Sequence, residues 1–317
     1  MQKWAAFWVL GLIWGSSFLL IRVGVEEVSP FQVVFMRTGI AALGLNLVLL
    51  LRGKHIPFNL RELFPLLVIG VGNTVIPFVL ISWGETQIDS GIASVLNATA
   101  ALFTAVLAHY AFRDERITIQ KIAGLALGFF GVVVLASRSW VDGQIVTGDL
   151  AGQLAVVVAS FFYALFGVYS RKLMHGRYEP MVISAGSMVA ASILSGLLML
   201  IAPYFNGQPP VPLADLTQDA LIALVLLGFL NTFIAYILFY WIIQQLGASR
   251  ASMVTYVTPA IALVLGAVVL NEIVDWRLLA GAALILSGIG VVNLRLRARP
   301  RPADVSTGDE LASEKAH

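Results

Sequence analysis

The chain has 317 residues, 59% of them hydrophobic and only 12% charged, with a mean hydropathy of +0.88. Soluble domains carry about 25% charged residues, and a soluble chain this apolar would expose patches that promote aggregation, so we expect a membrane protein. The net charge of +2 provides no basic field for nucleic acid, and the lack of cysteine excludes disulfides and thiolate metal sites. The histidines are scattered, so we expect no metal and no cofactor: His55, His109, His175 and His317.

Apolar runs of membrane-spanning length follow one another along the chain, separated by short polar or Pro/Gly-rich joints. The first run is about 20 residues long, too long for the apolar core of a signal peptide, so we expect an uncleaved helix. The ten predicted segments are Trp4–Val23, Pro30–Leu51, Leu63–Thr86, Ala93–Phe112, Lys121–Ser137, Asp149–Lys172, Pro180–Ala202, Asp219–Leu246, Ala251–Leu270 and Trp276–Leu294.

Positive charge is distributed unevenly over the predicted loops. With the N-terminus inside, 16 of the 20 Lys and Arg residues fall in inside segments, whereas outside segments hold only Arg22, Arg138 and Arg277. Cytoplasmic loops of membrane proteins are enriched in Lys and Arg. We therefore expect both termini to be cytoplasmic, in a multi-pass protein of the plasma (inner) membrane.

The sequence matches itself at a shift of about 158 residues. Gly70–Ile76 and Gly228–Ile234 share Gly-x-x-Asn-Thr-x-Ile, and Trp83 and Trp241 keep the same register. Chance matching of apolar sequence is the alternative, but several polar positions coincide in one register. A five-helix unit ends on the side opposite to its start, so the second copy is expected to be inverted, an arrangement that recurs in transporters.

The predicted fold is thus an all-α polytopic membrane protein with ten transmembrane helices in two inverted five-helix repeats. We expect the first repeat over 1–137, a linker at 138–147, the second repeat over 148–296 and a cytoplasmic tail at 297–317. The tail is polar and lacks apolar periodicity, which predicts disorder.

Short motifs in both halves resemble one transporter family. Trp14–Phe18 reads W-G-S-S-F, Phe35–Arg37 resembles a second-helix arginine motif, and the acidic turns at Arg113–Arg116 and Asn271–Glu272 precede the fifth and tenth segments. Together they resemble the EamA-type family of the drug/metabolite transporter superfamily. The resemblance implies ten helices around a central cavity, lined mainly by helices 1, 3, 4, 6, 8 and 9, and carriage of amino acids, related metabolites or drugs, commonly outward.

Arg37 is the most unusual polar residue, because it lies roughly 10 Å below the outer surface at about 1.5 Å per helical residue. A charge at membrane depth costs roughly 2.5–3.5 kcal/mol on insertion scales, so it should face protein or water. It is a candidate contact for a substrate carboxylate. The alternatives are a structural arginine or one that snorkels to the interface. Ser187 occupies its place in the second repeat.

Asn73 and Asn231 match each other and fall near the middle of the third and eighth segments. They are expected to bind substrate or to hold helices together, a contribution of about 0.6 kcal/mol per bond. Pro259 in the ninth segment, replaced by Ala101 in the fourth, would mark a hinge or an unwound site. The complete set of candidate substrate-binding residues is Arg37, Asn73, Asn231, Trp14, Phe78, Asn97, Tyr163 and Tyr256.

No acidic residue falls at the middle of a predicted segment. Glu85, Asp89, Glu115 and Glu272 lie near segment ends, so we expect solvated or helix-capping carboxylates. The sequence therefore gives no indication of proton coupling, and facilitated diffusion stays open.

These features favour a secondary transporter that works by alternating access on small organic metabolites. A channel or facilitator is the alternative, but no charge ring or filter loop is visible; a membrane-embedded enzyme is less favoured because no catalytic cluster is found. The expected partners are a small-molecule substrate and the lipid bilayer, and the chain is expected to be a monomer or weak homodimer. Glycines in the fifth and tenth segments predict close helix pairing, within one chain or between two.

Overall fold

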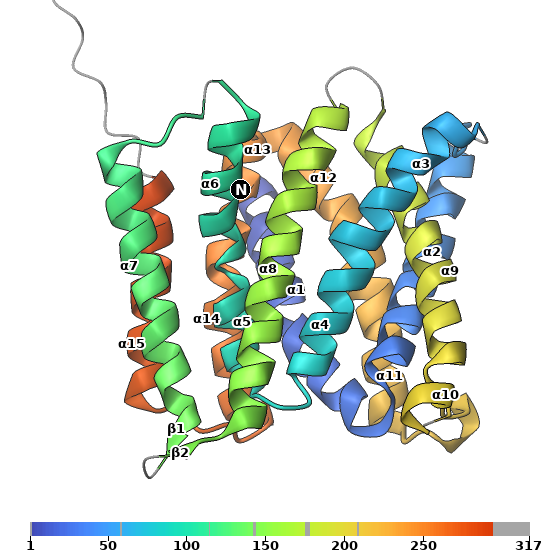
Figure 1. The fold of residues 1–317 in the computed structure, drawn as a ribbon. Helices are drawn as coiled ribbons and strands as arrows, with labels where there is room; N and C mark the ends of the chain where they lie inside the picture. Colours follow the sequence, from blue (N-terminus) through green and yellow to red (C-terminus); the bar gives the residue numbers. More distant parts are fainter. Residues whose placement is uncertain are drawn as a thin grey trace, which may run out of the picture.

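The structure is a computed structural model that describes residues 2–57, 59–113, 115–141, 144–174, 178–207 and 209–293. Within them, nine helices are long and apolar enough to cross a membrane, and a tenth apolar helix, Val254–Val269, is shorter (Figure 1). The prediction of a polytopic α-helical membrane protein is confirmed. The predicted disordered tail, His175 and the acidic-turn residue Asp114 lie outside the described residues.

The first half of the chain forms five helical spans. Ser29 begins the second span: its side chain accepts a hydrogen bond from the Gln32 amide, and Pro30 follows at the first helical position, where no amide hydrogen is needed. Asn59 and Thr118 cap later helices in the same way. The elements are α1 (Gln2–Glu27), α2 (Pro30–Leu51), α3 (Leu60–Ile69), η1 (Gly70–Val75), α4 (Ile76–Gly84), α5 (Ser90–Asn97), α6 (Ala100–Ala111) and α7 (Ile119–Ala136).

A short connection joins the halves. It contains η2 (Ser137–Ser139) and a small antiparallel hairpin of β1 (Trp140–Val141) and β2 (Gln144–Ile145), within the predicted linker. The second half consists of α8 (Thr147–Met174), α9 (Pro180–Ile201), α10 (Pro203–Asn206), η3 (Leu213–Asp215), α11 (Gln218–Gly228), η4 (Phe229–Ile234), α12 (Ala235–Leu246), α13 (Ala248–Ala251), α14 (Val254–Val269) and α15 (Trp276–Asn293).

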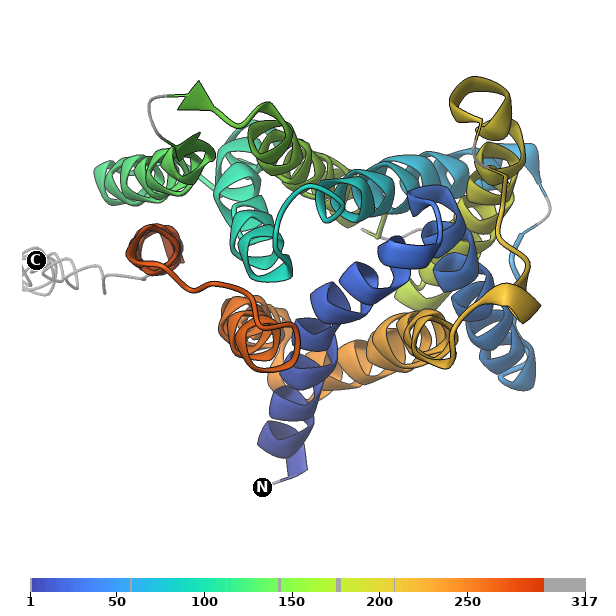
Figure 2. The same ribbon diagram turned by 90° about the horizontal axis from the view of Figure 1, so that it is seen from below.

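The two halves are intertwined rather than set side by side. Seen from below, α1 runs obliquely beside α11 and α14 of the second half, and these helices are in contact (Figure 2). Conversely, α8 packs against α4, α5 and α6 of the first half, and α2 packs against α9. Most contacts near the centre therefore join residues from both halves.

The two ends of the helix bundle can be told apart by the chain segments that lie there. The start of α1 and the end of α15 lie at one end, which we call the terminal end; the β1–β2 hairpin lies at the other, the hairpin end (Figure 1). Glu85, Asp89 and the joint before α15 are also at the hairpin end.

Matched π-helical turns interrupt the third and eighth spans. η1 and η4 contain Asn73 and Asn231 at matched positions, and the Thr232 hydroxyl donates to the Leu227 carbonyl five residues earlier, at 2.8 Å. Wide turns of this kind occur frequently at functional sites.

Of the two roles expected for Pro259, the unwound site is not found, because α14 is helical through this residue. Pro259 is in the second turn of α14, so the Thr255 carbonyl is the helical acceptor that loses its donor. The interruption occurs instead in the span without proline, where residues 98–99 form a tight turn between α5 and α6.

Glycines bring α7 and α15 into close contact within one chain. A Cβ at Gly288 would lie 2.5 Å from the Gly128 amide nitrogen and 2.6 Å from the Gly124 carbonyl oxygen. A Cβ at Gly131 would lie 2.9 Å from the carbonyl oxygen of Gly281. The glycines of the fifth and tenth spans therefore serve a contact inside the monomer.

Candidate functional site

Arg37 lies between the two halves of the chain. Its Nε donates a 2.8 Å hydrogen bond to the Thr232 hydroxyl in η4, and its guanidinium carbon is 4.0 Å from the centre of the Phe78 ring in α4. Thr232 is fully buried, so the side chain turns into the protein and does not snorkel. A cation stacked on a ring gains about 0.5–2 kcal/mol, more as it is less exposed, and Arg37 is half-buried.

The charge of Arg37 has no acidic partner at contact distance. Within the described residues, none of the ion pairs includes Arg37, and its two terminal nitrogens form no hydrogen bond. These nitrogens provide the fork of N–H donors that matches a carboxylate.

Aromatic rings continue the site away from Arg37. The Phe78 ring meets the Tyr163 ring of α8 edge to face, with centroids 6.3 Å apart. Three of the predicted residues, Arg37, Phe78 and Tyr163, thus form one cluster, and Thr232 joins it although the sequence did not single it out. The sequence feature that could have pointed to Thr232 is the Asn-Thr pair that occurs in both halves, as Asn73-Thr74 and Asn231-Thr232.

Asn231 has a structural role beside this cluster. It is fully buried, and its Nδ2 donates to the Ile13 carbonyl and lies 3.1 Å and 3.0 Å from the hydroxyls of Ser16 and Ser17 in α1. These bonds hold η4 against α1, while the buried Oδ1 of Asn231 has no partner among the described residues. Trp14, on the same stretch of α1, packs against Phe239, with ring centroids 5.1 Å apart.

The remaining predicted residues are not gathered at one point. Asn73 is half-buried in η1, and the half-buried Asn97 at the end of α5 has a buried Oδ1 without a partner among the described residues. The Tyr256 hydroxyl accepts a 2.5 Å hydrogen bond from Asn293 at the terminal end.

A cleft of about 380 Å³ lies elsewhere, between the α2–α3 joint and the start of α9. Lys54, Glu62, Tyr178 and Glu179 are among its lining residues, and none of the predicted substrate-binding residues lines it. The cleft lies at the terminal end, and its lining residues include both basic and acidic side chains.

Glu85 contradicts the expectation of a solvated or capping carboxylate. It follows α4 in the turn between the third and fourth spans, its exposed fraction is 0%, and neither carboxylate oxygen has a hydrogen-bond partner among the described residues. Burial raises the pKa of the Glu85 carboxyl well above its usual value; Glu272 adds to this rise, and Arg22 and Arg37 oppose it. α1 and α8 cover the turn, and such long-range packing has no local sequence signal.

Glu272 caps a helix, which is one of the two roles expected for it, the other being a solvated carboxylate. The helix that it caps, α5, belongs to the first half of the chain. Its two carboxylate oxygens accept hydrogen bonds from the amides of Ser90 and Gly91 at the start of α5, at 2.7 and 3.0 Å. A carboxylate at a helix N-terminus is favoured by both the free amides and the helix dipole.

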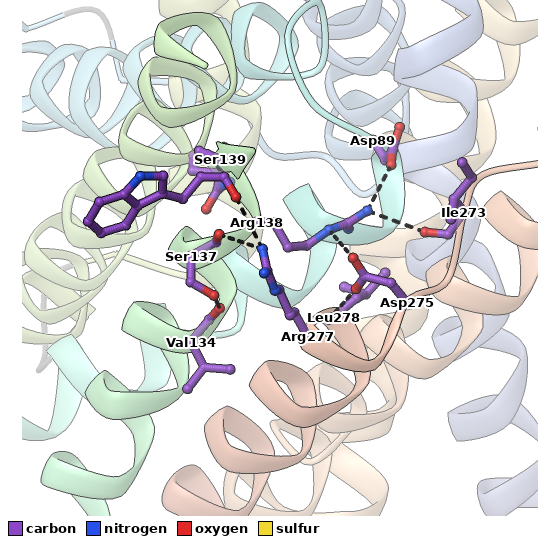
Figure 3. Close-up of polar contacts among 11 residues, drawn as sticks. Asp89, Val134, Ser137, Arg138, Ser139, Ile273, Asp275, Arg277 and Leu278 are labelled. Carbon is purple, nitrogen blue, oxygen red and sulfur yellow. Dashed lines mark hydrogen bonds and ion pairs between the residues drawn. The ribbon is translucent and has the colours of Figure 1, made fainter. Parts of the chain in front are cut away.

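Arginines complete the closure of the hairpin end (Figure 3). The Arg138 guanidinium lies 3.1 Å from Asp275 and 3.8 Å from Asp89, and Arg277 donates a 2.8 Å hydrogen bond to the Ser137 carbonyl. Arg138 comes from the connection between the halves and Asp275 from the second half, so the ion pair fastens this connection to the second half.

The chain matches proteins of known name over nearly its full length. The model of the EamA-like transporter family matches residues 3–137 and 150–294. A protein of Archaeoglobus fulgidus named "Uncharacterized transporter" is 30% identical to this chain. The match covers 92% of this chain and 99% of the length of that protein. A "Probable terminal-alkyne amino-acid exporter" of Streptantibioticus cattleyicolor is 28% identical, over 96% and 98% respectively. A solved crystal structure, 21% identical, shares the fold with a TM-score of 0.62 over 92% of this chain and 97% of that one.

Proposed function

Because the chain belongs to the EamA-like transporter family of membrane transporters, we propose that it exports small metabolites that carry a carboxylate, amino acids among them, by alternating access. The similarity to a relative named as an amino-acid exporter supports the substrate class and the direction. The charge distribution of the loops supports a plasma-membrane orientation with the terminal end in the cytoplasm.

The unpaired guanidinium of Arg37 is the observation that carries this proposal. It is held between the halves by Phe78 and Thr232, and its terminal nitrogens are left for another acceptor. A half-buried charge without an acidic partner is costly, and a bound carboxylate would offset part of that cost. The rings of Phe78 and Tyr163 would face the apolar part of the same substrate.

Unequal closure at the two ends supports alternating access. The terminal end is bridged by Lys54–Glu179 at 2.5 Å and by Arg171–Glu115 at 3.3 Å, between side chains that are 36–58% exposed, and exposed pairs contribute about 0–1 kcal/mol. At the hairpin end, Glu272 makes two charge-assisted hydrogen bonds to α5, each worth about 1.5–3 kcal/mol. The hairpin end is therefore the more firmly closed, as expected of a carrier that faces the cytoplasm.

Flux measurements with purified protein in liposomes test the proposal. The assay compares neutral amino acids with a cationic dye in wild-type protein and in Arg37→Gln, Arg37→Lys and the exposed control Arg61→Gln. Loss of about 1.5–3 kcal/mol of charged hydrogen bonding predicts a roughly ten- to hundredfold fall in amino-acid flux for Arg37→Gln. Arg37→Lys should retain part of the flux and Arg61→Gln all of it.

Two results would contradict the proposal. The absence of flux for every solute with folded wild-type protein would exclude transport of these compounds. An equal loss of amino-acid and dye flux in Arg37→Gln would make Arg37 a structural residue and not a carboxylate contact.

A further inference from the structure

Glu85 is the buried ionisable group that the proposed substrate site leaves unused. Its carboxyl group is enclosed, without a hydrogen-bond partner among the described residues, while its backbone carbonyl accepts a hydrogen bond from Arg22. The backbone is thus fixed and the side chain is not engaged. A carboxyl group in such a place is far more stable protonated than ionised.

The charged groups around Glu85 come from several elements. Arg22 of α1 and Arg37 of α2 favour the ionised form, and Glu272, from the joint before α15, disfavours it. The α8 face against the preceding residue, Gly84, is uncharged, since it presents Val156 and the backbone of Gly152.

Asp89, on the same turn, is engaged by Arg138. The carboxyl group of Glu85 therefore interacts electrostatically with both the proposed substrate arginine, Arg37, and the carboxylate that caps α5 at the hairpin end, Glu272.

We propose that Glu85 is the proton-binding site of a proton-coupled exchange, in which its protonation permits the hairpin end to close and its ionisation accompanies opening. The proposal rests on the proposed transport function. A proton from the outside forms the O–H bond at a Glu85 carboxylate oxygen in the open state. In the closed state the bond breaks as the proton passes to water on the cytoplasmic side, and the ionised Glu85 then favours opening of the hairpin end with substrate bound.

The sign of the pH effect follows from the two states. In the closed state burial raises the pKa of Glu85, whereas a hydrated carboxyl in the open state titrates near its ordinary value. At a pH between these two pKa values, closure of the hairpin end is accompanied by protonation of Glu85. Raising the outside pH therefore favours opening of the hairpin end, and lowering it favours closure.

Cysteine labelling reports the opening directly, because the chain has no cysteine of its own. Ser82 is one turn before Glu85 in α4 and is 1% exposed, so a membrane-impermeant maleimide should label the Ser82→Cys protein only when the hairpin end opens. Labelling of otherwise wild-type protein, expressed relative to the same protein unfolded at each pH so that the pH dependence of thiolate reactivity cancels, should rise severalfold from pH 5.5 to 8.5. Adding Glu85→Gln, which mimics the protonated group, should keep labelling low at every pH.

Two further variants serve as controls. Glu85→Asp retains a titratable group and should retain the pH response. Glu26→Gln removes an exposed carboxylate at the same end of the bundle and should behave like the wild type. Labelling that is independent of pH in the wild type, or that responds equally in Glu85→Gln, would overturn the proposal.

Transport measurements separate this proposal from the transport function itself. Exchange of radiolabelled neutral amino acids at equal pH on both sides tests transport alone, and its absence would count against the proposed function. With one-for-one exchange, a pH gradient of one unit should sustain about a tenfold amino-acid gradient at zero membrane potential. Exchange at equal pH without any response to the gradient would overturn the role of Glu85 alone.

Discussion

Replacing Gly288 with alanine tests the close contact between α7 and α15. The added Cβ would lie 2.5 Å from the Gly128 amide nitrogen and 2.6 Å from the Gly124 carbonyl oxygen. Nonbonded heavy atoms prefer separations of about 3.5–4.0 Å, so the helices would have to move apart by about 1 Å. Both neighbours are backbone atoms, and no change of side-chain rotamer can relieve the clash.

The expected cost follows from this geometry. Overpacking a close-packed contact costs about 1–3 kcal/mol, and the two backbone contacts place Gly288→Ala in the upper part of that range. Alanine also favours a helix over glycine by about 1 kcal/mol, which partly conceals the loss. Gly290→Ala is the matched control, since it lies in the same helix and nothing lies within 4 Å of its Cβ. The difference between the two variants removes the propensity contribution.

The free energy of unfolding of both variants can be measured by titration with a denaturing detergent in mixed micelles, followed by tryptophan fluorescence. Gly288→Ala should be less stable than Gly290→Ala by about 1–3 kcal/mol, a factor of roughly 5 to 160 in the unfolding equilibrium constant. Equal stability of the two variants would refute the claim that α7 and α15 need glycine at Gly288.

Two further effects on stability concern Asn231 and Arg138. Asn231→Ala removes the bonds to the Ile13 carbonyl and neighbouring hydroxyls, so the same titration should show a loss of about 1–3 kcal/mol; unchanged stability would mean that η4 is held by packing alone. Arg138→Gln and Asp275→Asn should each lower stability by about 0.2–1 kcal/mol, with a double-mutant loss smaller than the sum; strictly additive losses would exclude a direct ion pair.

The helical spans could be predicted because membrane-spanning segments are long apolar runs, and every predicted segment overlaps a helix of the structure. Arg37, Phe78 and Tyr163 could be chosen by residue type and position, and the structure brings them together. Their mutual contact depends on the crossing of helices from two halves, which has no local signal.

Other features of the structure could not be predicted from the sequence, for physical reasons. Glu85 stands in a polar joint that resembles a solvated turn, and its burial depends on packing by α1 and α8. Pro259 is a strong helix breaker in isolation, yet α14 continues through it. The wide turns η1 and η4 differ from an α-helix by a change of hydrogen-bond pattern that composition does not reveal.

The matched wide turns also carry information about descent. A π-helical turn contains one residue more than the α-helical turn it replaces, and it rotates everything beyond it by about 100° about the helix axis. Both family-matched regions contain such a turn, each with its Asn-Thr pair at the same place. A residue inserted before a duplication of the repeat would be inherited by both copies, which would account for the shared turn and the shared Asn-Thr pair.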